Sequence, residues 1–223
     1  MVKKTREATL ATRESLLAAA LQVFRERGVA HTRLSDVAER AGVTRGAIYW
    51  HFKDKAELFQ AVCERGTLPV EALLAEASQS VQDDPLATVR QLALMALTQL
   101  ARHADTQAMF DVIFHKCEFT EELAPVVAKN DADRAACLSQ VQRLFMQAVA
   151  CGQLPADTDT FLATQGLHAY MVGLMHEWVL NPESYDLAAC AEALLDCYLI
   201  GLATRPPLCR PAAGPAESAA QPS

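Results

Sequence analysis

Apolar side chains recur along the chain at intervals of three and four residues, the spacing that places them on one face of an α-helix. In the first part of the chain, short polar runs or single glycines separate these stretches. Gly28 and Gly42 each follow one stretch, where a glycine can end a helix by adopting a positive φ. The pattern therefore predicts four helices here, over residues 9–27, 32–41, 44–52 and about 56–80.

The remainder of the chain shows the same helical spacing, and no stretch alternates between apolar and polar residues for long enough to predict a strand. Asp84 and Pro85 are suited to open one helix, and Asn181 with Pro182 to end another. Pro125 is expected to distort the longest helix. Helices are predicted over residues 86–104, around 109–114, and over 121–150, 157–180 and 186–203.

These stretches describe an all-α protein of about nine helices in three sections. Residues 1–55 form a compact N-terminal domain of three helices, and residues 56–204 form a larger helical C-terminal domain. Five of the ten prolines fall after Arg205, so residues 205–223 are predicted to be a disordered tail rich in proline and alanine.

The charges are divided unevenly between the front of the chain and the rest. The formal net charge is −7, but the first 62 residues carry eleven Lys or Arg and seven acids, a charge of +4. The remaining 161 residues carry nine bases and twenty acids, a charge of −11. This distribution is expected when only one end of a protein meets a polyanion. The alternative is a chance fluctuation of surface charge.

Composition also excludes several classes of protein. The seven cysteines contain no C-x-x-C pair, which argues against a disulfide framework or a zinc ribbon and favours reduced thiols in the cytoplasm. No secretion signal is expected, because no apolar segment follows the basic first residues. The least charged long stretch, 161–180, contains His168, His176 and Glu177, so it is interpreted as a buried or dimer-forming helix and not as a membrane span. No metal or cofactor is expected.

The segment from Leu34 to Phe52 has the pattern of a helix-turn-helix. Ala38 is small where the two helices must cross closely, and Gly42 allows the positive φ of a sharp turn. Ile48 is expected to face the angle between the helices. Thr44 is suited to cap the second helix while its hydroxyl remains available to a phosphate.

The outward face of the second helix carries the candidate chemistry for reading DNA. Arg45 lies at the N-terminal end, from which recognition helices reach base edges, and its predicted partner is guanine. Ala47 is small enough to meet a thymine methyl group, and Tyr49 and His51 can donate to phosphates. The alternative for Tyr49, Trp50 and His51 is that they cover the edge of the core. The predicted DNA-binding residues are Thr32, Arg33, Thr44, Arg45, Gly46, Ala47, Tyr49, Trp50, His51 and Lys55.

At these residues the chain resembles a known family. The run from Ala41 to Leu58, AGVTRGAIYWHFKDKAEL, is similar to the DNA-binding signature of TetR-family transcriptional regulators, and the resemblance extends over about residues 9–60. The tryptophan after Tyr49 is similar to the branch that represses multidrug efflux operons. Two short segments, 115–120 and 152–155, resemble the AcrR and TtgR efflux repressors within that branch.

The resemblance implies a repressor that binds a palindromic DNA operator as a homodimer through its last two helices, in the cytoplasm and associated with the nucleoid. It also implies that a small hydrophobic inducer enters the body and releases the operator. Asp111 and His115, four residues apart, are suited to fix a polar part of that ligand, although a surface ion pair is an alternative for them. The predicted ligand-binding residues are Leu92, Ala96, Phe110, Asp111, Phe114, His115, Cys137, Val141 and Met171.

Other functions remain open at this point. Each predicted ligand residue could instead be an ordinary core residue. The regulated operon could instead be a metabolic or redox-responsive one. Six histidines and seven cysteines allow a metal sensor, and Cys117 or Cys137 a redox sensor, although neither residue type forms a ligand cluster in the sequence. An enzyme is the least favoured class, because the sequence has no G-x-G-x-x-G, P-loop, H-E-x-x-H or G-x-S-x-G motif.

Overall fold

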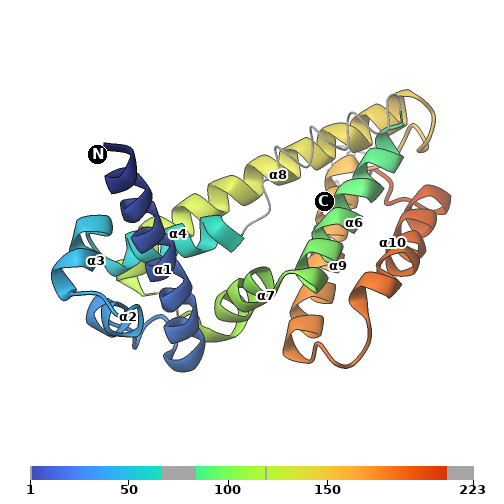
Figure 1. The fold of residues 1–223 in the computed structure, drawn as a ribbon. Helices are drawn as coiled ribbons and strands as arrows, with labels where there is room; N and C mark the ends of the chain where they lie inside the picture. The colour runs from blue at the N-terminus through green and yellow to red at the C-terminus, as the bar shows by residue number, and fades with distance from the viewer. Residues whose placement is uncertain (1, 67–83, 119, 210–223) are drawn as a thin grey trace, which may run out of the picture.

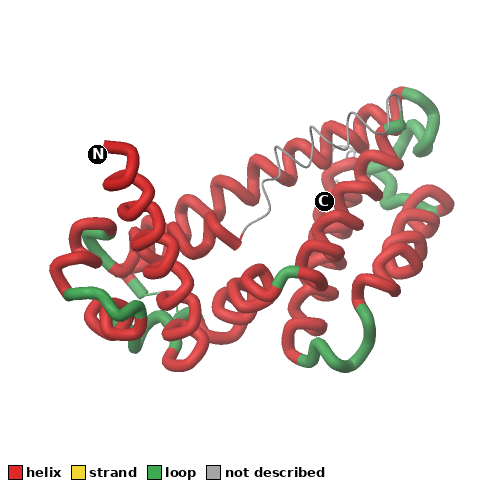
Figure 2. Tube along the Cα trace, in the orientation of Figure 1, coloured by secondary structure: helices red, strands yellow, loops and turns green. Residues whose placement is uncertain are grey.

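The computed structural model describes residues 2–66, 84–118 and 120–209, and the regular elements in these ranges are all helical (Figure 1). Figure 2 shows short loops between the helices and no strand in the part that is described. The described α-helices are α1 Val2–Arg27, α2 Leu34–Arg40, α3 Arg45–His51, α4 Lys55–Gly66, α6 Pro85–Arg102, α7 Ala104–Asp111, α8 Ala124–Ala150, α9 Thr160–Leu180 and α10 Leu187–Thr204. A π-helix, η1, spans Val112–Lys116, and a short 3₁₀-helix, η2, spans Glu121–Leu123.

The all-α prediction is confirmed, and α2 and α3 lie where the spacing places them. α1 begins at Val2, seven residues before the predicted start at residue 9. The helix predicted over 56–80 corresponds to α4 as far as Gly66, and residues 67–80 lie outside the described residues.

Two predictions about the helices of the body have outcomes with local causes. The helix predicted over 86–104 ends at Arg102, because His103 has extended backbone angles and separates α6 from α7. The distortion predicted near Pro125 in the stretch 121–150 is confirmed: Glu121–Leu123 is a 3₁₀-helix, and α8 begins at Ala124 with Pro125 in its first turn. A proline is tolerated there, since the first N–H groups of a helix have no partner within it.

The predicted disorder of residues 205–223 is wrong for residues 205–209. The Cys209 N–H donates to the Asp157 carbonyl at 2.9 Å, and the Asp159 N–H donates to the Pro207 carbonyl at 2.7 Å. These bonds form an isolated antiparallel bridge between Thr158 and Leu208. The amino-acid composition of this segment could not predict the pairing, because the bonds are made by backbone N–H and carbonyl groups, which are present whatever the side chains. Residues 210–223 lie outside the described part of the chain.

A hydrophobic core holds α1, α2, α3 and α4 together. Phe24, Val37, Ile48 and Phe52, all predicted to be core residues, are buried in it. The ring of Phe24 meets that of Phe59 of α4 edge to face, with 5.6 Å between the centroids. The same core takes in residues of α7, η1, η2 and α8, so it continues past the domain boundary predicted at residue 55.

We call α1–α3 the head and α6–α10 the body. Figure 1 shows α3 at one end of the molecule and α10 at the other, with α8 running along the body toward α4. In the body, α10 packs on α6, and α8 packs on α6 and α9. α7 and η1 connect the two parts, since α7 packs on α1 and α4 as well as on α6 and α9. A change in the body can therefore reach the head through α7 and η1.

Candidate nucleic-acid interface and ligand site

The turn between α2 and α3 is tight, and its backbone bonds fix the angle between the two helices. Gly42 has a φ of 67°, a value that a residue with a Cβ rarely adopts. Its N–H donates to the Glu39 carbonyl at 3.1 Å, and the next N–H, that of Val43, donates to the Ala38 carbonyl at 3.0 Å. The turn therefore requires glycine at this position.

α3 is anchored from the inside and capped at its start. Ile48 is fully buried between α3 and the rest of the head, and Phe52, directly after the helix, is buried as well. The Thr44 hydroxyl oxygen accepts the Ala47 N–H at 3.2 Å, which is the predicted N-cap. With the apolar residues held inward, the opposite face of the helix is turned to solvent.

The outward face carries the predicted DNA-reading side chains. Thr44, Arg45, Gly46, Tyr49 and Trp50 are exposed, and Ala47 and His51 are half-buried. Trp50 is 82% exposed, so it does not cover the edge of the core as the alternative held. The Arg45 guanidinium lies over the Tyr49 ring, with 5.8 Å between Cζ and the ring centroid. An exposed row of a cation and aromatic rings on one helix face suits contact with duplex DNA.

Two of the predicted DNA-binding side chains are used inside the protein instead. Thr32 is 2% exposed, and its hydroxyl donates to the Gly28 carbonyl at 2.7 Å. The Lys55 side chain is 11% exposed, and its ammonium donates to the Ala30 carbonyl at 3.1 Å and pairs with Glu122 at 3.0 Å. Both assignments to DNA are therefore corrected: these residues stabilise the head and its contact with η2.

The neighbours of these two residues remain on the surface. Arg33 is exposed and caps α2 with its backbone N–H, which donates to the Asp36 carboxylate at 3.0 Å. Lys53, in the loop after α3, is exposed and lies 3.9 Å from Asp54. Sequence reasoning did not include Lys53, although its position next to the aromatic end of α3 was a usable signal.

The structure brings the predicted ligand residues together only in part. The rings of Phe110 and Phe114 lie 5.4 Å apart between centroids, tilted by 34°, and both pack with Met171 against the core between α6, α9 and α10. Val141 packs against a second body core between α6, α8, α9 and α10, which Met171 also touches. The other predicted apolar ligand residues are half-buried: Leu92 and Ala96 on α6, and Cys137 on α8.

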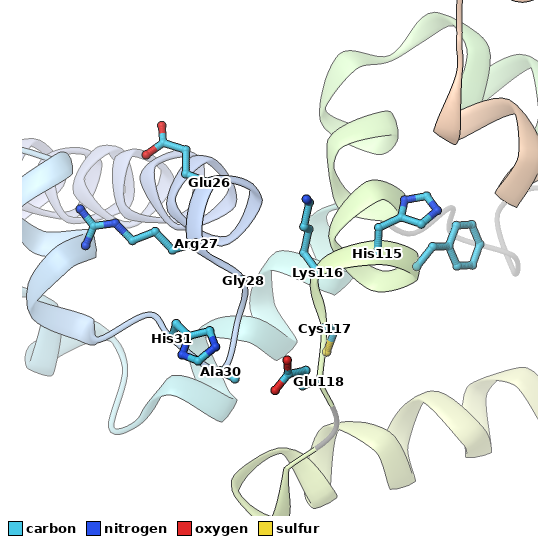
Figure 3. Close-up of a pocket in the computed structure, with 10 residues that line it drawn as sticks. Glu26, Arg27, Gly28, Ala30, His31, His115, Lys116, Cys117 and Glu118 are labelled. Atoms are coloured by element: carbon cyan, nitrogen blue, oxygen red, sulfur yellow. The ribbon is translucent and has the colours of Figure 1, made fainter.

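A hollow of about 330 Å³ lies where the head meets η1 (Figure 3). Of the predicted ligand residues, only Phe114 and His115 line it. In Figure 3 the His115 ring points away from Glu26 and Arg27 of the head. The lining residues are Glu26, Arg27, Gly28, Ala30, His31, Phe114, His115, Lys116, Cys117 and Glu118.

His115 is held by one ring nitrogen and leaves the other buried without a partner. Its Nδ1 lies 3.1 Å from the Asp111 carboxylate, and its Nε2 is buried with no hydrogen-bond partner among the described residues. The ring lies 5.0 Å from that of His176 on α9.

On α8, the Oε1 of Gln140 is similarly buried and unpaired in the part of the chain that is described. Sequence reasoning missed Gln140, although it lies three residues from Cys137 and one from Val141.

The buried thiols do not favour the redox alternative. Burial, with the nearby Cys117 as a smaller cause, raises the pKa of Cys63 to about 12. Burial also raises the pKa of Cys117 and that of Cys137 above their ordinary value. Since the thiolate is the reactive form, raised pKa values lower thiol reactivity. Within the described ranges, no group of three or more His, Cys, Asp or Glu side chains is placed to hold a metal ion.

The outer surfaces of α9 and α10 expose large apolar side chains. Gly166 of α9 lies close to α10, since a Cβ on it would lie 2.6 Å from the Tyr198 hydroxyl. Gly173 has no such neighbour within 4 Å. α10 is long and apolar enough to cross a membrane by length and composition alone, and 22% of it is buried. The exposed apolar residues on these helices include Phe161, Leu162, Val172, Leu180 and Ile200.

A helix-turn-helix with an exposed second helix, joined to an all-helical body, defines the class of helix-turn-helix transcriptional regulators. Comparison with family models agrees: residues 16–62 match the model described as bacterial regulatory proteins, tetR family. Residues 84–203 match the model of the C-terminal region of MAATS-type transcriptional repressors. The chain belongs to the TetR family.

Individual relatives match over nearly the whole chain. The transcriptional regulator TtgR of Pseudomonas putida is 39% identical over 209 residues, which cover 93% of this chain and 99% of TtgR. The crystal structure of NalD, the secondary repressor of the MexAB-OprM multidrug efflux pump in Pseudomonas aeruginosa, matches with a TM-score of 0.79 and 34% identity over 87% of this chain and 97% of NalD.

A third relative is known with a ligand. The complex of SmeT with triclosan matches with a TM-score of 0.73 and 31% identity, and covers 86% of this chain and 91% of SmeT. SmeT is the repressor of the Stenotrophomonas maltophilia multidrug efflux pump SmeDEF. Regulators of the TetR family bind DNA operators and small-molecule ligands, and dimers are typical of them.

Proposed function

We propose that this protein is a dimeric repressor of a multidrug efflux operon that leaves its operator when a hydrophobic drug-like inducer binds the body. The observation that carries the proposal is the orientation of α3: Ile48 fixes the helix from inside, while Arg45, Tyr49 and Trp50 are exposed on its outer face. The efflux operon is inferred from the relatives, because NalD and SmeT both repress multidrug efflux pumps.

The DNA is read by two copies of α3 in successive major grooves. Arg45 donates to a guanine edge, Ala47 meets a thymine methyl group, and Tyr49 and His51 donate to phosphates. Lys53 takes the position beside the phosphates that was first assigned to Lys55. On a palindromic operator, the two copies of α3 lie about 34–36 Å apart, one turn of the duplex.

The two heads are joined through the outer faces of α9 and α10 of two subunits. These faces expose Phe161 and Ile200 among other apolar side chains, and such a surface is stabilised by pairing with a second copy. The apolar length of α10 is accounted for by this pairing. As a gene regulator the dimer acts in the cytoplasm, on the nucleoid.

The inducer site lies among α6, α7, η1, α8 and α9. Phe110, Phe114 and Met171 supply adaptable apolar contacts, and His115 and Gln140 supply the two buried polar atoms that lack partners. Such a site accepts flat or flexible apolar molecules that carry one or two polar groups. Triclosan, which SmeT binds, is a molecule of this kind and serves as the first probe.

The test uses the full chain and the DNA upstream of its own gene and of neighbouring pump genes. We expect the chain to protect one palindromic segment from nuclease digestion, and triclosan to weaken that binding by about 5- to 150-fold, the usual range of allosteric coupling. Non-specific binding only, at every upstream segment tested, would contradict the repressor. Specific binding that neither triclosan nor other hydrophobic drugs weaken would contradict the inducer.

A further inference from the structure

The last turn of α1 is tied to the start of η1 by a carboxylate that has a second partner. The Nε of Arg25 donates to Oδ2 of Asp111 at 3.2 Å. The other oxygen, Oδ1, lies 3.1 Å from the Nδ1 of His115. Asp111 therefore contacts the head with one oxygen and an imidazole of the body with the other.

The contact with Asp111 determines the hydrogen-bonding role of the other ring nitrogen of His115, Nε2. A carboxylate only accepts hydrogen bonds, so the proton of a neutral His115 lies on Nδ1, and Nε2 carries a lone pair. Nε2 is buried without a partner among the described residues, and the ring packs against His176. A ligand group that donates to Nε2, or that displaces the ring, acts on the same imidazole that Asp111 holds.

The surrounding backbone carries the link further. η1 is a π-helix, an element with one extra residue in its turn that is frequent at functional sites. Directly across the junction, the Val29 N–H donates to the Lys116 carbonyl at 3.0 Å. A Cβ on Gly28 would lie 3.2 Å from that same carbonyl oxygen, so the head and η1 are in close contact here. Movement of η1 therefore acts directly on the end of α1.

We infer that Asp111 couples the inducer site to the DNA-binding head, by positioning His115 and holding Arg25 at the same time. The inference rests on the proposed function. An inducer that moves His115 moves the Asp111 carboxylate, and Arg25 loses its partner. The end of α1 is then released from η1, and the head leaves the orientation that fits the operator.

The test compares substitutions of two arginines in the same helical turn that pair with different carboxylates. Arg25→Gln removes the bond to Asp111. Arg27→Gln removes the same charge from the same helical turn, but Arg27 lies 3.6 Å from Asp36, inside the head. For each chain, the operator dissociation constant is measured by fluorescence anisotropy with and without saturating triclosan, and the ratio of the two is the coupling factor.

We expect Arg25→Gln to bind triclosan as the wild type does and to lower the coupling factor about two- to fivefold, the range that a partly exposed ion pair supports. Arg27→Gln should leave the factor unchanged, and Arg25→Lys should retain more of it than Arg25→Gln. An unchanged factor in Arg25→Gln, or an equal loss in Arg27→Gln, would overturn the inference.

A second measurement needs no ligand. The Val29 amide lies within the same junction, so its hydrogen exchange should quicken in Arg25→Gln and not in Arg27→Gln. Equal exchange in the two variants would overturn the link between Arg25 and Asp111. If triclosan leaves the wild-type operator affinity unchanged, it is the inducer in the proposed function that fails, and the exchange of Val29 still decides whether the bridge holds the junction.

Discussion

Neighbouring residues of α3 serve two separate purposes. Ile48 is fully buried and fixes the helix to the head, whereas Arg45, three residues earlier, is exposed and lies over the Tyr49 ring. Because successive residues on a helix are about 100° apart, Tyr49 and Trp50 turn away from the buried side of Ile48, so one helix can hold itself in place and still present a reading surface. Substitution of the exposed residues should therefore change binding and leave the stability of the fold nearly unaffected.

Arg45→Ala tests this separation at the level of one side chain. A bidentate contact to guanine discriminates by about 1–3 kcal/mol, and the dimer uses the residue twice, so we expect specific operator affinity to fall at least tenfold. Affinity for an unrelated duplex should change little, and the melting temperature should stay within about 2 °C of the wild type.

The measurement is fluorescence anisotropy with operator and scrambled duplexes, together with thermal unfolding. Arg134→Ala is the control, because Arg134 is also exposed but lies on α8, where it pairs with Asp131 at 3.0 Å. Wild-type operator affinity in Arg45→Ala would remove Arg45 from the reading role.

At the level of elements, the sequence predicted those features that depend on neighbouring residues. Gly42 predicted the turn, Thr44 the cap and Ile48 the buried side of α3, because each effect arises within a few residues along the chain. Thr32 and Lys55 were misassigned for the opposite reason. Their partners, the carbonyls of Gly28 and Ala30 and the carboxylate of Glu122, depend on how the chain folds back on itself.

The link between α7 and the head illustrates the same limit. Apolar spacing predicted a helix around residues 109–114 and placed Asp111 and His115 one turn apart, which the structure confirms. It did not predict that η1 is a π-helix, since one wider turn leaves the spacing of apolar residues almost unchanged. Nor did it predict Arg25 as a partner, 86 residues away from Asp111.

The start of α6 offers a prediction about one element. The Asp84 carboxylate accepts the Ala87 N–H at 2.9 Å and the Gln153 side-chain amide at 2.7 Å, so it caps α6 and joins it to the loop after α8. Asp84→Ala should lower the free energy of unfolding by about 1–2 kcal/mol at pH 7, the upper part of the range for a lost cap. For a chain of this size, that is a fall of about 2–8 °C in melting temperature.

The effect of Asp84→Ala should depend on pH. The Ala87 N–H and then the Gln153 amide hold the pKa of Asp84 below its ordinary value of 3.8. The stabilisation is therefore complete above that value and is lost as the pH falls through the lower pKa of the folded state. The difference in melting temperature from wild type should narrow at pH 3. Asp131→Ala, within α8 and not a cap, is the control, and a loss of equal size there would contradict the capping role.

On the scale of the whole molecule, ion pairs hold the head and α4 against the more acidic body. Arg25 pairs with Asp111, Lys55 with Glu122 and Arg65 with Asp105, at 2.7–3.2 Å. In each pair the base comes from the front of the chain and the acid from the body. Arg25 and Lys55 belong to the first 62 residues, so the excess of bases there is used partly for this attachment, and α3 lies at the end of the molecule far from the acidic helices. The local charge near α3 is what a DNA duplex meets.

One head contacts only one half-site, so tight operator binding requires two joined heads. In the proposed dimer they are joined through α10, at the opposite end of each subunit from α3. Ile200 is 66% exposed on the outer face of α10, and Ile200→Glu would place two carboxylates near the two-fold axis of the proposed dimer.

We expect this variant to be monomeric at micromolar concentration by size-exclusion chromatography with light scattering. Its affinity for the palindrome should fall at least 100-fold, while its affinity for a single half-site should match that of the wild-type head. Met146→Glu is the control, since Met146 is 56% exposed on α8, which is not one of the two helices of the proposed interface, and that chain should stay dimeric. If the chain with Ile200→Glu remained a dimer and kept its full affinity for the palindrome, the two heads would have to be joined through a surface other than this face of α10.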